Sequence, residues 1–303
     1  MLSCLALACY AGLVAAVAPP VLVRARWPHR SPVCGVLAWQ GLMVAFVLSG
    51  FLAVHHLVSP RAHVHPGRWG AVAGCLVDLG AGDAAAGWLE AGGLLLRAPL
   101  VMMLLPLGWF AAVAGRAHLV RRRHRRILDL LARPAGTRRV VVLDHEVSKV
   151  YCLPGRGARV VLTAGALEAL SAEQLGAAVE HERAHIAGRH HLVLAVAEAF
   201  LRAFPGLPLS RSARRQTALL LEMAADDRAV RRHRRADLVG AMCTVAAGRP
   251  PSAALGAGGA SVVARAHRLV TSDRPLGVPA RAVVAAVTAL VCLVPLLVCG
   301  VVD

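Results

Sequence analysis

The chain has few aromatic residues, almost no lysine and no paired cysteine motif. Aromatic residues make up 4% of its 303 residues. The basic clusters are therefore not interleaved with aromatic residues. Proteins that bind single-stranded nucleic acid use such aromatic residues to stack against the bases. Lysine occurs only at Lys149, so arginine supplies the rest of the basic residues. The eight cysteines form no CxxC pair, which argues against a thiolate zinc site and against a disulfide framework. Although the net charge is +17, we expect no direct binding of nucleic acid.

Apolar residues, in contrast, are abundant. They make up 57% of the chain, and the mean hydropathy of +0.59 is well above that of an ordinary soluble domain. Four apolar runs are long enough to cross a bilayer. They cover about residues 2–23, 33–58, 91–114 and 280–302. A fifth run, about 192–204, is too short and contains Glu198 and Arg202, so we expect a buried or membrane-skimming helix there.

The positions of the basic residues orient these spans. No positive charge precedes the first run, whereas three arginines follow it, which is typical of an uncleaved span with its N-terminus outside. The basic run 121–126 follows the third span and predicts a cytoplasmic segment. The sequence therefore predicts a multi-pass protein of the plasma membrane with both termini extracytoplasmic. Residues 1–115 would hold three spans and an outer loop (about 59–88), 116–279 a cytoplasmic domain, and 280–303 the fourth span.

Helix and strand patterns alternate within the cytoplasmic region. The segments predicted as helices or strands are a basic helix over 116–132, strands over 140–143, 150–153 and 158–163, a short helix over 165–170, and a later helix over 216–235. Ser171 and Gln174 fit a capping box that opens another helix, and residues 249–260 read as a connector. The predicted fold is mainly α, with an α+β cytoplasmic domain that contains a small sheet.

The segment His181-Glu182-Arg183-Ala184-His185 carries the clearest chemical signal. It reads HExxH, and it lies on a predicted helix. Two histidines four residues apart project from one helical face, so that both imidazoles can bind one zinc ion. Glu182 directly follows the first histidine, where it can take a proton from a water beside the metal. The pattern predicts a zinc metallopeptidase with Glu182 as general base and one Zn²⁺ per chain.

Zinc needs a third protein ligand, and two residues are candidates. Glu222 lies on the later predicted helix, with Asp226 one turn on, where a carboxylate could orient a ligand histidine. His191 instead completes the longer pattern HExxHxxGxxH. Peptidases with this longer pattern also need a methionine turn downstream. The two candidates, Met223 and Met242, lie in helical patterns and not in a turn. We therefore favour Glu222 and keep His191 as the alternative metal ligand.

Four segments together carry a resemblance to known proteins. They are residues 160–167 before the site, the HExxH segment, Arg189-His190-His191 after it, and Glu222-Met223-Ala224-Ala225-Asp226. With these segments the chain resembles the membrane zinc peptidases of the BlaR/MecR antirepressor type, and it is similar to the HtpX/Ste membrane gluzincins. The resemblance implies a zincin-like domain in which His181, His185 and Glu222 bind zinc. It also implies that Glu182 is the general base and that Asp226 supports a ligand.

The resemblance further implies how a substrate would bind. Strand 158–163 would lie at the edge of the sheet beside the cleft, where an extended peptide can add through main-chain hydrogen bonds. The resemblance does not identify the group that stabilises the oxyanion. Arg228, Arg231 and His233 follow Glu222 on the predicted helix and are candidates for that role.

The function implied by this resemblance is proteolysis at the membrane. The substrate would be a cytoplasmic or membrane protein, for instance a BlaI-like repressor in a signalling pathway. Sensor-transducers of this type carry a penicillin-binding domain after the last span, and we expect none here because no SxxK motif occurs. The alternatives are HtpX-like quality control of membrane proteins and a non-catalytic transducer with a structural zinc site. Glu182 argues against the latter, because a structural site needs no general base.

Overall fold

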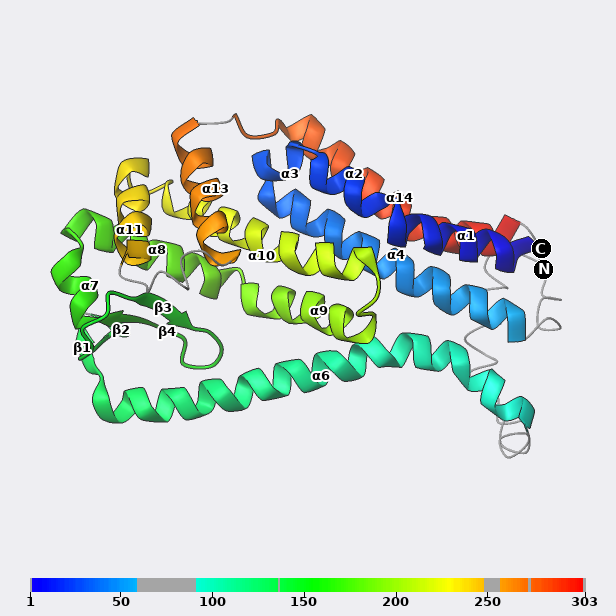
Figure 1. Cartoon of the computed structure of the whole chain (residues 1–303), viewed down its shortest axis with the longest axis horizontal. Coiled ribbons are helices and arrows are strands. Elements are labelled where there is room, and N and C mark those ends of the chain that lie inside the picture. Colours follow the sequence, from blue (N-terminus) through cyan, green and yellow to red (C-terminus); the bar gives the residue numbers. More distant parts are fainter. Residues whose placement is uncertain (1, 59–90, 136, 248–256, 272–273, 302–303) are drawn as a thin grey trace.

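The computed structural model describes residues 2–58, 91–135, 137–247, 257–271 and 274–301. The predicted outer loop and most of the predicted connector 249–260 lie outside these residues. Figure 1 shows the described elements in chain order. They are α1 (Leu2–Ala16), α2 (Ala18–Arg24), α3 (Trp27–Arg30), α4 (Pro32–Val58), α6 (Ala91–Leu131), β1 (Arg133–Ala135), β2 (Thr137–Leu143), β3 (Val150–Leu153), β4 (Arg159–Thr163), α7 (Ala164–Ala169), α8 (Ala172–Ala187), α9 (His190–Ala203), α10 (Pro208–Ala229), α11 (Arg235–Ala247), α13 (Ala257–Thr271) and α14 (Val278–Val301).

The predicted apolar runs form long helices. Four stretches are long and apolar enough to cross a membrane, namely Leu2–Arg24, Pro32–Leu57, Pro99–Leu131 and Val278–Val298. The third differs from its prediction, because α6 continues without interruption into the basic segment 116–131, which was expected as a separate helix. Arginine has a helix propensity close to that of leucine, and no proline lies between Pro106 and Pro134 to end the helix. Consequently α6 runs along most of the molecule (Figure 1).

The small sheet has β3 rather than β4 at its edge. Among the described strands the order is β1-β2-β4-β3, with β4 parallel to β2 and antiparallel to β3. The predicted edge position of strand 158–163 is therefore wrong. Gly155 and Gly157 adopt φ values of +106° and +71°, which allows the tight turn that folds β3 back onto β4. Val160 and Val161 are buried, as expected for an inner strand with a continuous apolar run.

The helix that carries HExxH begins as predicted. The Ser171 hydroxyl accepts a hydrogen bond from the Gln174 backbone N–H, and the Gln174 side chain accepts one from the Ser171 backbone N–H, so the capping box is confirmed. This helix, α8, ends at Ala187. Arg189 then adopts a left-handed conformation, with φ of 48°, and α9 begins at His190. The junction turns the chain so that the start of α9 lies beside the last turn of α8.

The helix predicted over 216–235 is α10, which begins and ends earlier. Pro208 stands in its first turn, where the missing N–H and the fixed φ suit a helix start. The first half of α10 contains many polar residues, so its sequence shows little apolar periodicity. Packing stabilises it instead, because Leu209 and Ala213 are fully buried. The connector predicted over 249–260 is shorter than expected at its C-terminal end, because residues 257–260 belong to α13.

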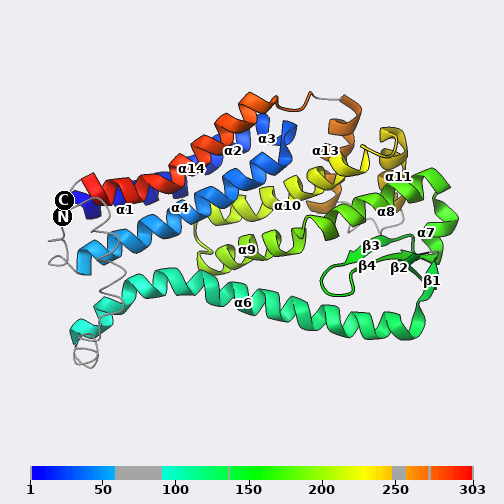
Figure 2. The ribbon, with the colours of Figure 1, turned by 180° about the vertical axis from the view of Figure 1, so that it is seen from behind.

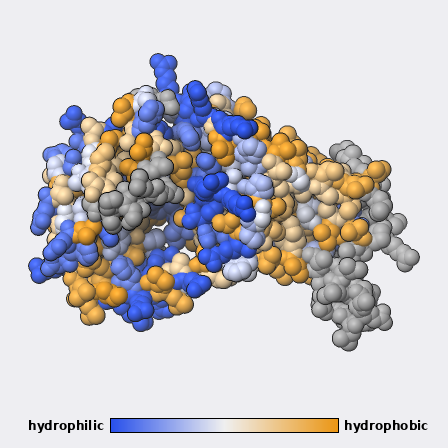
Figure 3. Space-filling view, in the orientation of Figure 1, coloured by the Kyte–Doolittle hydropathy of each residue, from blue (hydrophilic) through white to orange (hydrophobic). Residues whose placement is uncertain are grey.

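The largest apolar cluster joins the long apolar helices to the helices around HExxH. Its buried members come from α1, α4, α9 and α10: Val14, Val36, Trp39, Met43, Ala197, Phe200, Leu209, Ala213, Leu220, Leu221 and Met223. Figures 1 and 2 show α10 beside α4, and α9 between α10 and α6. The fifth apolar run thus forms a helix packed against two of the predicted spans. In Figure 3 apolar residues dominate the end of the molecule with α1, α4 and α14, and polar residues the end with the sheet.

Candidate active site

Two histidines of α8 form the centre of the site. His181 and His185 lie one turn apart, and their Nε2 atoms are 3.1 Å from each other. His181 is only 8% exposed, whereas His185 borders the cleft. The capping box fixes where α8 begins, and the start of α9 limits where it ends. Within this helix, the spacing of four residues brings the two Nε2 atoms together.

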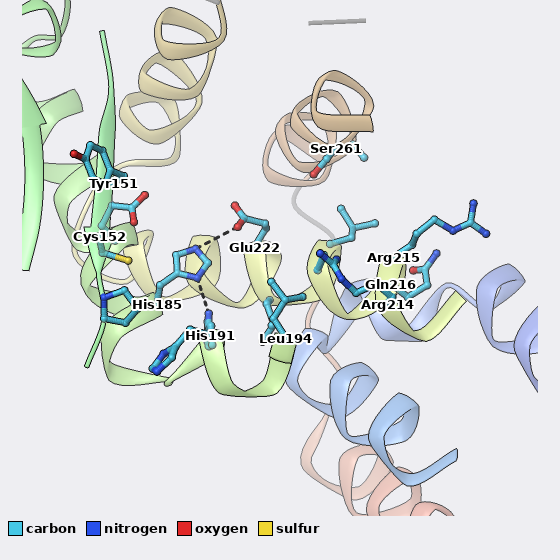
Figure 4. A pocket seen from close by; sticks show the side chains of 17 residues that line it. Tyr151, Cys152, His185, His191, Leu194, Arg214, Arg215, Gln216, Glu222 and Ser261 are labelled. Atoms are coloured by element: carbon cyan, nitrogen blue, oxygen red, sulfur yellow. Dashed lines mark hydrogen bonds and ion pairs between the residues drawn. The ribbon is translucent and has the colours of Figure 1, made fainter. Parts of the chain in front are cut away.

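Glu222 of α10 completes a group of three possible metal ligands. Its Oε2 lies 3.5 Å from Nε2 of His181, and its Oε1 lies 3.4 Å from Nε2 of His185. One ligand atom from each of the three residues lies within 4.8 Å of the others. Two imidazole nitrogens and one carboxylate oxygen are donors that Zn²⁺ takes in open, three-ligand sites, so this group fits zinc. Figure 4 shows His185 and Glu222 facing each other across the pocket.

His191 lies near this group but not within it. It stands on α9 and lines the same cleft, but the group of possible ligands contains Glu222 instead. Its neighbour His190 was not anticipated from the sequence. Nδ1 of His190 lies 2.8 Å from Nδ1 of His185, so one imidazole donates and the other accepts. A proton shared at this position leaves Nε2 of His185 free for a metal. A side chain at Gly188 would collide with the His190 ring, so the glycine leaves the space that this ring occupies.

Asp226 lies behind His181 in a fully buried position. Its Oδ1 is 2.9 Å from Nδ1 of His181. The guanidinium of Arg265, from α13, donates to both Asp226 oxygens at 2.6 and 2.8 Å, and it lies 2.8 Å from Glu222 Oε2. The adjacent Asp227 faces elsewhere, since it accepts two hydrogen bonds from Arg268 at 2.7 and 2.9 Å. The sequence patterns did not single out Arg265.

The charges of the metal-free group follow from these contacts. Burial lowers the pKa of His181, but its contacts with Asp226 and Glu222 outweigh burial and raise that pKa to about 9. Burial lowers the pKa of His185 to about 4. For Glu222, burial acts to raise the pKa, but His181 and Arg265 outweigh it and lower the value to about 2. At neutral pH the group therefore consists of a protonated His181, a neutral His185 and an ionised Glu222.

Glu182 lines the cleft beside the sheet edge. Burial raises its pKa, and Cys152 of β3 lies within hydrogen-bonding reach of it. A carboxylate with a raised pKa is a stronger base than an exposed one, which suits a group that accepts a proton from water. Burial also raises the pKa of the Cys152 thiol, so this cysteine is neutral at physiological pH. Cys152 thus reaches Glu182 from β3, the observed edge strand. Strand 158–163, which was predicted at the edge, lies inside the sheet.

The cleft at the site has a volume of about 820 Å³. It is bounded by the edge strand β3, by α9, by α10 and by α13 (Figure 4). The three proposed oxyanion groups are not part of its lining. Because α10 ends at Ala229, Arg231 and His233 follow that helix instead of continuing it, and the His233 ring packs against Gly176 of α8.

A histidine pair on one helix with a carboxylate from a later helix, beside a sheet edge, is the arrangement of zincin-type metallopeptidases. Residues 115–255 match the profile of Peptidase family M48. The matched region contains the sheet, the HExxH helix and Glu222, so this part of the chain is similar to the metallopeptidase domains of that family, which depends on zinc. Comparisons with curated proteins and with solved structures gave no match.

Proposed function

We propose that this chain is an integral membrane zinc metalloendopeptidase whose catalytic region, 116–279, faces the cytoplasm. The observation that carries the proposal is the group formed by His181, His185 and Glu222 next to Glu182. Zinc would be held by Nε2 of both histidines and by the Glu222 carboxylate. When bound, it would polarise the scissile carbonyl and acidify the attacking water. The predicted spans, residues 1–115 and 280–303, would anchor the catalytic region to the membrane.

The residues around the group supply the remaining chemistry. Glu182 accepts a proton from the attacking water and later delivers it to the leaving amine nitrogen, so the proton balance closes within one turnover. Asp226 and His190 hold the two histidine rings from behind and leave Nε2 of each free. The outer edge of β3 offers main-chain hydrogen bonds to an extended substrate peptide. Such binding places the scissile carbonyl near Glu182, because Cys152 of β3 lies beside it.

We propose a protein substrate from the cytoplasm or from the membrane. A BlaI-like repressor is favoured by the resemblance, and HtpX-like quality control of membrane proteins is the alternative. The arrangement of Glu182 supports an enzyme over a transducer with a structural zinc site. A half-buried carboxylate with a raised pKa that lines an open cleft has no role in holding a metal, but it suits a general base.

The decisive experiment compares zinc content and cleavage of casein by the full chain in detergent. The variants are Glu182→Gln, Glu222→Ala and His191→Ala. We expect Glu182→Gln to keep zinc and lose cleavage, Glu222→Ala to lose zinc, and His191→Ala to keep it. Zinc lost from His191→Ala but kept by Glu222→Ala would assign the third ligand to His191. A wild type that binds zinc but cleaves no more casein than Glu182→Gln would contradict the proposed activity.

A further inference from the structure

The hairpin formed by α9 and α10 lies alongside two of the proposed spans. The Phe46 ring, well inside α4, makes edge contacts with Phe200 and Phe204, with ring centroids 5.9 and 5.3 Å apart. Near the start of α4, a Cβ at Gly35 would lie only 2.9 Å from Leu220. The turn between α9 and α10 is therefore level with Phe46, whereas Leu220 of α10 is level with Gly35. Figures 1 and 2 both show this antiparallel arrangement.

The helix geometry gives the depth of the hairpin, with α4 and α6 taken as spans. Phe46 is eleven residues beyond Gly35, which corresponds to about 16 Å along an α-helix. The hydrocarbon layer is about 30 Å thick, so the turn reaches its middle. An independent contact agrees, because the Arg202 guanidinium lies 5.8 Å from the ring centroid of Trp109. Trp109 precedes Arg116, the first basic residue after the apolar part of α6, by seven residues, or about 10 Å.

Of the arginines on the hairpin, two share a carboxylate partner, Arg211 donates to the carbonyl of Pro205 at 3.1 Å, and Arg215 lines the active-site cleft. Glu198 accepts hydrogen bonds from Arg202 at 3.0 Å and from Arg214 at 2.7 Å. Ionisable groups at membrane depth are costly unless they are paired, and they mark functional sites. No charged residue occurs between Arg202 and Arg211, so the turn itself is apolar: Ala203-Phe204-Pro205-Gly206-Leu207-Pro208-Leu209-Ser210 contains only one polar side chain. That side chain, Ser210, donates to backbone carbonyls within the turn.

The active-site cleft connects this hairpin to the proposed metal group. Leu194, Arg214 and Leu219 line it on the hairpin side, and Glu182 and Glu222 line its other end. Glu222 follows Leu220 by two residues, so the metal group is level with the start of α4, at the membrane surface. A polypeptide in the cleft can thus have its scissile bond at the surface and its neighbouring residues within the bilayer.

We infer that α9 and α10 form a re-entrant membrane hairpin, and that the cleft takes the membrane-proximal segment of a membrane-anchored protein. The substrate is cut close to its own span, because the metal group is level with the start of α4. This inference rests on the proposed peptidase function and specifies its substrate class. It distinguishes a protein held in the bilayer from a freely diffusing cytoplasmic one.

The depth of the hairpin is measured first, in lipid nanodiscs with the unmodified chain. Hydrogen exchange compares two Pro-Gly turns, Pro205-Gly206 of the hairpin and Pro154-Gly155 between β3 and β4. We expect the Gly206 amide to exchange at least tenfold more slowly than the Gly155 amide. In a second measurement, on a cysteine-free background, a fluorophore on Gly206→Cys is quenched by lipids with a spin label deep in the acyl chain. The same fluorophore on Glu168→Cys of α7 is not. Exchange of Gly206 as fast as Gly155, with no quenching, would overturn the re-entrant hairpin.

The substrate class is then tested with one anchored reporter. A transmembrane helix carries a cytoplasmic tail of identical unstructured repeats, and mass spectrometry maps the cuts after incubation with the full chain in vesicles. We expect cuts confined to the repeat next to the helix, and none with Glu182→Gln. Cuts spread evenly along the tail, or cleavage of casein without any cut in the reporter, would overturn the substrate class and leave the peptidase function intact. A zinc-loaded wild type that cuts neither protein would reject the proposed function, and the hairpin would still be judged by its depth.

Discussion

Replacing Asp226 by asparagine separates the support of the metal group from the general stability of α10. The change keeps the shape of the side chain but removes its charge, in a position with no exposed surface. Arg265 then keeps Glu222 as a carboxylate partner, and Nδ1 of His181 loses its contact with a carboxylate. Breaking a buried ion pair costs roughly 3–5 kcal/mol, and we expect the low end, about 3 kcal/mol, because Glu222 still neutralises Arg265.

The neighbouring Asp227→Asn is the matched control. Asp227 also pairs with an arginine of α13, but its side chain is 37% exposed and it does not contact His181. The loss for this variant is about 0–1 kcal/mol. Zinc affinity discriminates further, since removing a group that orients a ligand histidine weakens binding by about 10–100-fold. We expect that loss in Asp226→Asn, and less than threefold in Asp227→Asn.

The assay combines thermal unfolding of the metal-free protein with zinc titration against a chromophoric chelator. Its pH dependence provides an internal check. Burial opposes ionisation of Asp226, but Arg265 outweighs it and holds its pKa below the ordinary value of 3.8. Its stabilising effect is therefore complete above pH 4 and is lost as the pH falls through the lower folded-state pKa. The gap between wild type and Asp226→Asn should close in that acidic range. Equal losses in both variants, in stability and in zinc affinity, would refute the role assigned to Asp226.

Three further predictions concern the same region. Arg265→Met leaves two acidic side chains without their partner, so the metal-free protein should lose about 3 kcal/mol, and zinc should restore more stability than it gives wild type in paired melting curves. Because the pKa of His181 is about 9, its proton stabilises the metal-free fold fully below pH 6.5 and no longer above pH 9. Zinc must displace that proton, so its affinity should rise about tenfold per pH unit from 7 to 9 and then level off, and a flat titration would contradict the assignment. Ser171→Ala removes a cap of α8 and should lower stability by about 1 kcal/mol without changing zinc stoichiometry, as measured by unfolding and elemental analysis.

Local features could be predicted from the sequence because their physics is local. HExxH needs only a helix, and the capping box at Ser171 shows where that helix begins. The spacing from Glu222 to Asp226 is again one helical turn. The apolar runs follow from hydropathy, which depends on composition within a window and not on partners.

Features that depend on distant pairing could not be predicted in this way. Whether β4 is an edge strand or an inner strand depends on which strands flank it. The apolar pattern of β4 is consistent with either position. Arg265 reaches Asp226 across 39 positions of sequence, on a helix that begins inside a segment expected to be a connector. His190 follows the HExxH helix in sequence, and the left-handed conformation of Arg189 turns it back to His185.

The position of Arg265 has a consequence for biosynthesis. The segment with family resemblance ends at residue 255, but the guanidinium that holds Asp226 and Glu222 comes from α13, which leads directly into α14. The chain after α13 contacts the end of α3, since the backbone N–H of Leu276 donates to the carbonyl of Arg30 and the Arg30 side chain donates to that of Arg274. Translation must therefore have passed α13 before the pocket is complete. Until then, the nascent chain carries a histidine pair without its full set of neighbours.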